Sequence, residues 1–363
     1  MSGNPAYSVD QGVGEALAQF SAPSKLGFGV VPAPVMFSAE FRDGSWGPGT
    51  LLPFGPISIL PNSRAVQFAE SIFEGMKAYR ARPAAPHLFR PLYNYRRFAA
   101  SADRVGMPQV PEWLFLQGIS AVADACAEII PEQEGASLYL RPSLFSTEGG
   151  YTVSNSSAFR YMVLASPSAA YSNGPMRARI ERDDVRAARG GVGNAKTGGN
   201  YAAAFRATSR AVHEGFAVAL WLDPIERRMI DEFSAMNLFA VIEGELHTPE
   251  LTDSILSGVT RDSVLTLARA GGMEMHERPM VIDGLLADIK SGKCTEVIAT
   301  GTAAIVTSIS ALGDADGQIY CPAETRVSDR LRAELLAIQT RQATDSFGWT
   351  MDIKSKDEVH TVG

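Results

Sequence analysis

The sequence has few cysteines and histidines and no surplus of positive charge. Cys126, Cys294 and Cys321 are odd in number and widely scattered, which argues against a disulfide framework or a zinc site and fits a reducing cytoplasm. We expect all three to be buried small hydrophobic residues. We predict no metal site, because no two of the histidines show metal-ligand spacing: His87, His213, His247, His276 and His360. The formal net charge of -7 argues against a broad nucleic-acid-binding surface.

Long apolar runs are also missing. No stretch approaches the roughly 18 apolar residues of a membrane span, and the N-terminus lacks a basic run followed by an apolar core. We therefore expect no signal peptide and a cytoplasmic protein. What is present is ordinary for a soluble globular protein: 45% of the 363 residues are hydrophobic and 20% are charged. At roughly 150 residues per domain, this length suggests two domains.

The first half of the chain mixes strand and helix patterns. Residues 1–30 are weakly patterned and predict an arm over the surface, and residues 30–60 form short apolar runs broken by Gly and Pro. Helical spacing over 92–104 and 113–130, the latter followed by Pro131, predicts two helices. Two strands, SLYLRPSLF and RYMVLASP, follow.

We place the domain boundary in the loop SAAYSNGP, which follows the second of these strands. The predicted domains are a smaller N-terminal α/β domain with an arm (1–170) and a larger C-terminal domain (171–363). Beyond the boundary the pattern predicts a strand (217–223), a hairpin (238–249), a helix (262–272), a strand (274–280), a helix (282–292) and a strand (296–301). The fold class is therefore α/β, with two layered halves and no internal repeat.

The most informative segment is ARGGVGNAKTGGNYAAAF, residues 188–205, in which five glycines surround Lys196. One hypothesis is a phosphate loop, because Gly190 and the Ala-Lys-Thr at 195–197 differ by one residue from G-x-x-x-x-G-K-[ST]. Two features argue against it. Charged residues precede the segment where an apolar strand is needed, and Gly198-Gly199-Asn200 follows the lysine where an uninterrupted helix is needed.

A second hypothesis makes Lys196 a nucleophile. Its amine would have to be partly neutral, which a desolvated pocket favours, and Tyr201 would donate a hydrogen bond to a ring oxygen of a bound aldehyde cofactor. The plain alternative is a glycine-rich surface turn that carries a solvated lysine.

Three further segments bear on this choice. Residues 257–262, SGVTRD, open a helix and offer N–H groups to an anion, although a plain helix cap has the same pattern. Residues 299–304, ATGTAA, follow a strand and form either a second such cup or an ordinary turn. Glu232 lies at the edge of an apolar strand, where it is either a turn residue or an acid for a pyridine nitrogen. An amine, a phosphate cup and an acid together match pyridoxal 5'-phosphate.

The chain resembles the branched-chain amino-acid aminotransferases, a family of fold-type-IV pyridoxal-phosphate enzymes. The matching segments occur in family order over roughly residues 30–340: FEGMKAYR, HLFRPLYNYRRFAASADRVGMP, LYLRP, GGVGNAKTGGNYAAAF, EFSAMN, LTDSILSGVTRDSVLTLA and EVIATGTAAI. The resemblance implies a two-domain fold of the D-amino-acid-aminotransferase type, with pyridoxal 5'-phosphate as the cofactor.

The resemblance also implies roles for individual residues. Lys196 is similar to the catalytic lysine that forms the Schiff base and moves the proton. Tyr201 is similar to the tyrosine on the cofactor's ring oxygen, and Glu232 to the carboxylate on its pyridine nitrogen. The phosphate contacts are implied for Arg97, Val259, Thr260 and Thr302. The substrate pocket is implied for Phe68, Phe73, Tyr139, Arg141, Ala235 and Ala303, with Arg141 on the distal carboxylate of 2-oxoglutarate.

The implied reaction is a ping-pong transfer of an amino group between a branched-chain L-amino acid and 2-oxoglutarate. The resemblance also implies a homodimer whose protomers lend each other pocket residues. Two alternatives stay open: a related transaminase for a larger or aromatic amino acid, and a lyase or racemase on the same fold.

The sequence departs from the family in its substrate region. Phe68 stands where the family has a pocket tyrosine, and Ser234 and Ala235 replace a flexible residue and a hydroxyl near the substrate carboxylate. The loop 147–157 and the segment 307–309 also differ. These changes spare the lysine and the cofactor residues, so the prediction for the cofactor is firmer than the prediction for the substrate.

Overall fold

The computed structural model describes residues 6–171 and 174–353. The chain divides into two compact units. The first holds Met1–Tyr171, Lys196–Gly198 and the chain from Ile338 on, and the second holds Ser172–Ala195 and Gly199–Ala337. In this grouping Lys196–Gly198 falls with the N-terminal residues, whereas the predicted ranges count these three residues with the C-terminal domain. No helix among the described residues is long and apolar enough to cross a membrane.

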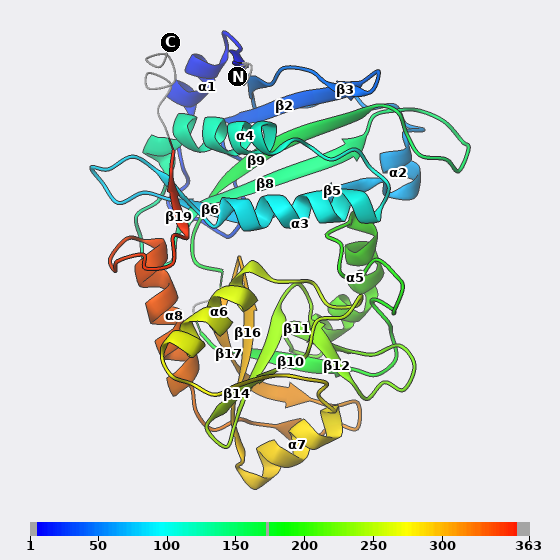
Figure 1. Cartoon of the computed structure of the whole chain (residues 1–363), viewed down its shortest axis with the longest axis vertical. Coiled ribbons are helices and arrows are strands. Elements are labelled where there is room, and N and C mark those ends of the chain that lie inside the picture. Colours follow the sequence, from blue (N-terminus) through cyan, green and yellow to red (C-terminus); the bar gives the residue numbers. More distant parts are fainter. Residues whose placement is uncertain (1–5, 172–173, 354–363) are drawn as a thin grey trace. The chain divides into compact units, whose positions relative to one another are not determined.

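The first unit is built on a ten-stranded sheet in the order β1-β4-β2-β9-β8-β6-β7-β19, with β3 beside β2 and β5 beside β8 (Figure 1). Its longest pairing is antiparallel, between β8 and β9, and runs from Ser137 opposite Ser168 to Ser146 opposite Phe159. The strands are β1 Ser8–Val9, β2 Val35–Arg42, β3 Ser45–Trp46, β4 Thr50–Pro53, β5 Ser71–Phe73, β6 Met76–Tyr79, β7 His87–Phe89, β8 Ser137–Ser146, β9 Phe159–Ser168 and β19 Thr350–Asp352.

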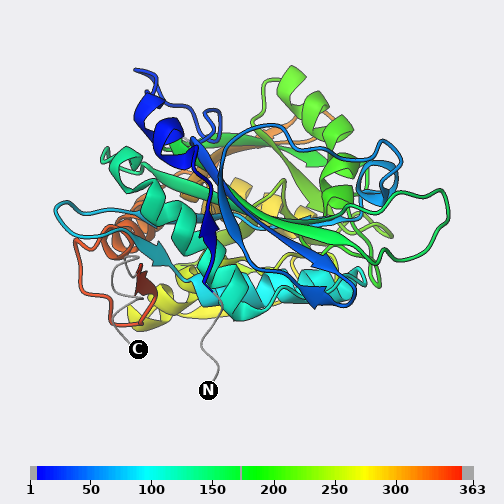
Figure 2. The same cartoon turned by 90° about the horizontal axis from the view of Figure 1, so that it is seen from above.

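The two predicted helices of this unit are confirmed as α3 Pro91–Arg104 and α4 Glu112–Ala125. Pro91 starts α3 at a position where the missing N–H costs nothing. α4 contacts β2, β8 and β9, and α3 contacts α4 (Figure 2). The buried rings of Phe98 and Phe115 join these helices to the sheet through Tyr161. A short 3-10 turn, η1 Ala127–Ile129, follows α4, and the smaller helices are α1 Val13–Gln19 and α2 Arg64–Phe68.

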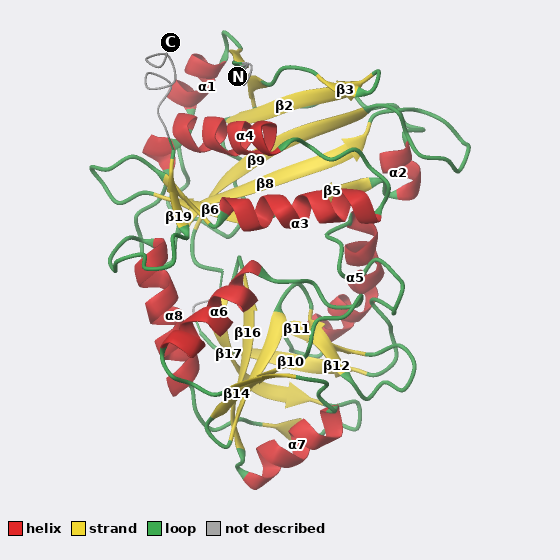
Figure 3. Cartoon of the chain, viewed as in Figure 1, coloured by secondary structure: helices red, strands yellow, loops and turns green. Residues whose placement is uncertain are grey.

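The second unit is built on a nine-stranded mixed sheet in the order β12-β11-β10-β17-β16-β13-β14-β15, with β18 beside β17 (Figure 3). The predicted hairpin is confirmed as the antiparallel pair β13 and β14, whereas β14 and β15 are parallel. The strands are β10 Met176–Glu181, β11 Val218–Leu222, β12 Ile230–Phe233, β13 Asn237–Ile242, β14 Glu245–Thr248, β15 Met275–Glu277, β16 Cys294–Gly301, β17 Ile305–Gly313 and β18 Ile319–Tyr320.

Four helices belong mainly to this unit: α5 Gly198–His213, α6 Val259–Ala270, α7 Ile282–Ser291 and α8 Arg326–Gln339. The prediction that no uninterrupted helix follows Lys196 is wrong, because α5 begins at Gly198. Its alanine face explains this result, since Ala204 and Ala207 form a buried cluster with Trp221 on β11. Tertiary packing of this kind outweighs the low helix propensity of two glycines at the start.

The charged residues that precede the lysine segment include the end of strand β10. Arg179 and Glu181 on this strand are 6% and 1% exposed. They form an ion pair at 3.1 Å, and Arg210 also binds Glu181 at 2.6 Å. Buried charges persist when they are paired, so a core strand has a polar sequence here.

The cysteines differ from one another in burial. Cys126 and Cys294 are buried, whereas Cys321 is exposed, so the expectation of three buried thiols is wrong for Cys321. Burial raises the pKa of the Cys126 thiol and of the Cys294 thiol to about 12. These two thiols therefore stay protonated and unreactive at neutral pH.

Candidate active site

The backbone of Lys196 is fixed beside β5 of the first unit. The Lys196 carbonyl accepts a hydrogen bond from the Phe73 N–H at 2.9 Å, and the Lys196 N–H donates to Ser101 Oγ at 2.9 Å. Thr197 forms an isolated antiparallel bridge with Ile72, and its hydroxyl donates to the Ser71 carbonyl at 2.8 Å. The lysine is therefore held on both sides, and its side chain starts from a defined point.

The glycine-rich loop before the lysine is equally well anchored, within the second unit. Asn200 Nδ2 donates to the carbonyls of Val192 and Ala195 at 2.6 and 2.9 Å. The Asn194 N–H donates to the Asp253 carbonyl at 2.8 Å. A side chain at position 193 has no room, because a Cβ would lie 2.6 Å from the Cα of Ser254. The plain alternative of a solvated surface turn does not fit this packing.

Beside Lys196 lies a buried ion pair that the sequence did not reveal. The Glu74 side chain is fully buried, and Arg97 on α3 binds it through two nitrogens, with Nε at 2.6 Å and Nη2 at 2.8 Å. Asn94 Nδ2 also donates to Glu74, at 2.8 Å. The Nζ atom of Lys196 lies 4.5 Å from the centre of the Phe73 ring, next to Glu74 in the sequence.

The charge of Glu74 follows from these neighbours. Burial acts to raise the pKa of this carboxyl, but Arg97, then Lys196 and Asn94, act more strongly together and hold the pKa below its usual value. Glu74 is therefore an anion at neutral pH, paired with the Arg97 guanidinium. The only sequence signal for it was its place in FEGMKAYR, between Phe73 and a glycine.

Three residues predicted for the substrate pocket come together in the first unit. The Arg141 guanidinium lies 4.6 Å from the centre of the Phe73 ring, and its Nη2 donates to the Tyr139 hydroxyl at 2.8 Å. Phe28, from the N-terminal arm, packs edge-on against Tyr139 with ring centres 5.0 Å apart. The N-terminal arm therefore contacts a predicted pocket residue. The weak sequence pattern of the arm did not predict this contact.

Gly75 allows this arrangement, because a Cβ there would lie 2.3 Å from the Tyr139 hydroxyl oxygen.

Phe68 differs from the other predicted pocket residues in its exposure. It ends α2 and its side chain is 47% exposed, so its ring lies on the surface of the first unit.

In the second unit, Glu232 on β12 is a buried and well-partnered acid. It is 4% exposed, and its two oxygens have different partners. Arg186 binds Oε1 at 2.8 Å, whereas Oε2 accepts hydrogen bonds from Asn237 Nδ2 at 2.9 Å and from the Leu256 N–H at 3.3 Å. This environment fixes the direction of the carboxylate.

Asn237 is a second functional residue that the sequence did not single out. Its Nδ2 also donates to the Leu256 carbonyl at 2.9 Å, and it lies opposite Thr300 of β16 in the sheet register. A Cβ on Gly258 would lie 2.0 Å from its Oδ1. Asn237 therefore ties the acid Glu232 to the start of α6 and to the end of β16.

The start of α6 has the features of an anion site. Gly258 caps the helix without a side-chain hydrogen bond, and Val259 and Thr260 follow as buried residues of the first turn. N–H groups at a helix start and the helix dipole favour an anion. Thr302 and Ala303 lie half-buried in the turn between β16 and β17.

The remaining predicted positions have local explanations. Tyr201 is half-buried in α5. Ser234 accepts a hydrogen bond from Trp221 Nε1 at 3.2 Å, so this departure from the family pattern serves packing. Ala235 adopts a left-handed backbone conformation with φ of 61° in the turn between β12 and β13, a conformation more often given to glycine.

The chain is similar to known proteins over most of its length. The family model for amino-transferase class IV matches residues 71–312. A probable branched-chain-amino-acid aminotransferase of Staphylococcus aureus strain N315 is 40% identical, over 92% of this chain and 95% of that protein. Branched-chain-amino-acid transaminase 1 of Bacillus subtilis strain 168 is 36% identical, over 91% and 95%.

A solved structure is also similar. The T.th. branched-chain amino acid aminotransferase with pyridoxamine 5'-phosphate is 28% identical and covers 91% of this chain and 99% of that one, with a TM-score of 0.69. The family model matches more than half of the chain, and the curated relatives match nearly all of it. The chain therefore belongs to the branched-chain-amino-acid aminotransferases within the class IV family, and it is an aminotransferase of that type.

Proposed function

We propose that the enzyme uses pyridoxal 5'-phosphate, held by Lys196, to move an amino group between a branched-chain L-amino acid and 2-oxoglutarate in a ping-pong cycle. The observation that carries the proposal is the fixed Lys196 beside the buried Glu74–Arg97 pair. The names of the relatives support the substrate class, and the T.th. structure with pyridoxamine 5'-phosphate supports the cofactor.

The residues present fit this cofactor. Its aldehyde needs an amine, which Lys196 supplies, and its pyridine nitrogen needs an acid such as the buried Glu232. Its phosphate needs N–H groups at a helix start, and α6 begins directly after Gly258, an N-cap residue that brings no side chain into that space. Gly258 is also required by packing, because Asn237 occupies the space of a Cβ. When bound, the cofactor would supply an electron-withdrawing ring next to the substrate's α-carbon.

Each residue then has a defined task. Lys196 would hold the cofactor through its amine, and the freed amine would carry the proton from the substrate's α-carbon to the C4′ carbon of the cofactor. Glu232 would keep a proton on the pyridine nitrogen, and Tyr201 would donate its phenolic hydrogen to the ring oxygen. The phosphate contacts would come from Arg97, the N–H groups of Val259 and Thr260, and the Thr302 hydroxyl. Glu74 holds the Arg97 guanidinium in one orientation, which fixes its position for the phosphate.

Substrate recognition rests on Arg141 and its aromatic neighbours. The planar guanidinium suits the distal carboxylate of 2-oxoglutarate. The rings of Phe73 and Tyr139, against which Arg141 already packs, suit an apolar side chain. The α-carboxylate would meet the N–H of Ala303 near Ala235. Because Ala235 brings no hydroxyl, this end of the substrate has one polar partner fewer than in the family pattern.

We also propose a homodimer in which Phe68 of one protomer completes the partner's pocket. Several exposed apolar side chains on α2, before it and in the loop 147–157 support this proposal, since exposed apolar surface marks interfaces. We call these side chains the α2 surface. Arg64 of α2 holds the neighbouring loop through Glu148 at 2.8 Å and Ser154 at 3.0 Å. The α2 surface consists of Phe54, Ile59, Leu60, Val66, Phe68, Tyr151 and Val153.

The first prediction concerns the amino donor. We expect the purified enzyme to absorb visible light through bound cofactor, and leucine, isoleucine, valine and glutamate to discharge that band. Phenylalanine should discharge it at least about tenfold more slowly, because a pocket shaped for a smaller side chain discriminates by about 1–3 kcal/mol. Stopped-flow absorbance measures the rate at which each single amino acid discharges the visible band. Discharge by phenylalanine alone would contradict the branched-chain proposal, and discharge by none of them would contradict transamination.

The second prediction concerns Glu74. The Glu74→Gln substitution should lower the free energy of unfolding by about 3 kcal/mol at neutral pH, because it leaves a buried guanidinium without its partner. It should also weaken cofactor binding about tenfold by releasing Arg97. Since the pKa of Glu74 is lowered in the folded protein, its contribution is present above about pH 4.3 and is lost as the pH falls. The stability difference between the two proteins should therefore shrink in acid.

Urea unfolding from pH 7 to pH 3 and cofactor titration test this prediction. The matched control is Glu128→Gln, which also removes a carboxylate that pairs with two arginines, Arg80 and Arg82, but whose side chain is 71% exposed. Exposed pairs contribute little, so the control should behave like the wild type. Equal effects of the two substitutions would contradict the assigned role of Glu74.

The third prediction concerns assembly. A charge in the α2 surface should break the dimer, because a buried unpaired carboxylate is costly. We expect Val66→Asp, at a side chain that is 55% exposed, to sediment as a monomer. Ile225→Asp, at an 83% exposed apolar position in the second unit, should stay a dimer. Sedimentation velocity of the wild type and both variants at equal concentration measures their oligomeric state. A wild-type monomer, or a Val66→Asp dimer, would contradict the proposed interface.

A further inference from the structure

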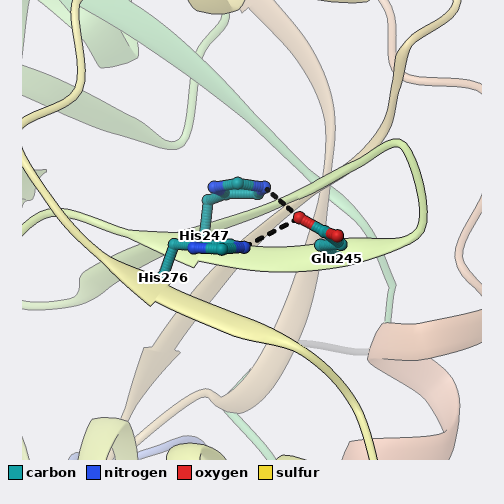
Figure 4. A group of neighbouring side chains, drawn as sticks. All are labelled: Glu245, His247 and His276. Atoms are coloured by element: carbon teal, nitrogen blue, oxygen red, sulfur yellow. Dashed lines mark hydrogen bonds and ion pairs between the residues drawn. The ribbon is translucent and has the colours of Figure 1, made fainter.

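Two histidines and a glutamate lie together at the edge of the second sheet, and none of the three is assigned to the cofactor. β14 and β15 are neighbouring parallel strands, and their register places His247 directly opposite His276. Glu245 precedes His247 by two residues, so both side chains lie on one face of β14. Figure 4 shows the two imidazoles and the carboxylate turned toward one another. One ligand atom from each residue lies within 4.8 Å of the others.

Both imidazoles face the same carboxylate oxygen. His276 Nε2 lies 2.7 Å from Glu245 Oε2, and His247 Nε2 lies 4.0 Å from it. The two rings are stacked, with centres 4.6 Å apart and planes 17° apart. Two ligands of one zinc ion, each at about 2.1 Å, are at most about 4.2 Å apart. Small side-chain rotations would therefore bring the three atoms around a single ion.

The fold itself makes little use of the polar atoms of His247. Its side chain is 4% exposed, and its Nδ1 is buried without a hydrogen-bond partner in the part of the chain that the structure describes. Its Nε2 faces Glu245 beyond hydrogen-bond length. A buried polar group with so few partners is costly. Of the two ring nitrogens, Nε2 is the one that faces the carboxylate (Figure 4).

The protonation state of His247 suits a ligand. Burial lowers the pKa of the His247 imidazole most, and the charges of Arg278 and His276 lower it further. The Glu245 carboxylate and the Ile242 carbonyl raise this pKa, but by less. His247 is therefore neutral at pH 7, and a neutral imidazole can donate a lone pair. The positive charge of Arg278 works against a dication, so we expect weaker binding than at a closed four-ligand zinc site.

We propose that Glu245, His247 and His276 form a site for a divalent transition-metal ion of the Zn²⁺ class, with two imidazole nitrogens and one carboxylate oxygen as ligands. Water fills the open position, because the side chains of His276 and Glu245 are 41% and 46% exposed. The ion would bind the edge strand β15 to β14 and stabilise the folded chain by mass action. Sequence spacing could not indicate this site, because its two histidines are brought together only by strand pairing. The inference does not rest on the transaminase proposal.

The test measures metal binding to the untagged holoenzyme after treatment with a chelator. Zn²⁺ affinity is measured by competition with a chromophoric chelator, and Co²⁺ is added separately to record its visible d–d bands. We expect one ion per chain and a higher thermal midpoint with Zn²⁺. His276→Gln and Glu245→Gln should each weaken binding at least about tenfold, in line with the effect of losing metal-site partners. Both positions are partly exposed, so the variants should fold, which circular dichroism checks.

Two control variants show where the ion binds. His213→Gln removes an exposed histidine at the end of α5, and Cys321→Ser removes the exposed thiol; both should bind Zn²⁺ like the wild type. No binding by the wild type would overturn the proposal and leave His276 and Glu245 as a simple ion pair. Unchanged binding in His276→Gln and Glu245→Gln, or its loss in Cys321→Ser, would also overturn it.

Discussion

The buried carboxylate of Glu74 is the feature on which the proposed active site depends. A fully buried anion is costly by itself, and this one is stabilised by the two-nitrogen contact with Arg97, by Asn94 and by the charge of Lys196. The same contact holds the Arg97 guanidinium, which the proposed phosphate site needs, in one position. Because Glu74 both orients Arg97 and is itself buried, a change at Glu74 should alter cofactor binding and stability together.

The second unit repeats this arrangement around another acid. Glu232 is held by Arg186, Asn237 and a backbone N–H, and Asn237 reaches from there to the start of α6. In both clusters an asparagine and an arginine fix a buried carboxylate. Preorganised charges of this kind act on a cofactor without rearrangement during the reaction. Hence the residues that do no chemistry, Asn94 and Asn237, matter for those that do.

The sequence predicted the elements whose signal is local. The amphipathic patterns of α3, α4 and α7, the hairpin of β13 and β14, and the motifs around Lys196 and Glu232 all lie within short windows. The failures share one physical cause, which is dependence on partners far along the chain. α5 forms despite Gly198 and Gly199 because its alanines pack on β11. β10 is hard to recognise as a core strand because its charges are buried, and the second partner of Glu181, Arg210, lies 29 residues later.

The same limit applies to the site. Lys196, Arg141 and Glu232 belong to recognisable motifs, so their resemblance to a family could be seen. The role of Glu74 depends on Arg97, 23 residues later, and the contact of Phe28 with Tyr139 joins the arm to a central strand. Only the folded chain brings such pairs together.

The central claim is that Lys196 carries the cofactor, and covalent labelling tests it most directly. Borohydride reduction of the holoenzyme, followed by proteolysis and mass spectrometry, locates the attached cofactor. We predict the added mass on the peptide that contains Lys196, and no labelling of Lys196→Ala. The rival is Lys77, a lysine of FEGMKAYR that is 3% exposed. Label on Lys77, or label that survives in Lys196→Ala, would contradict the account.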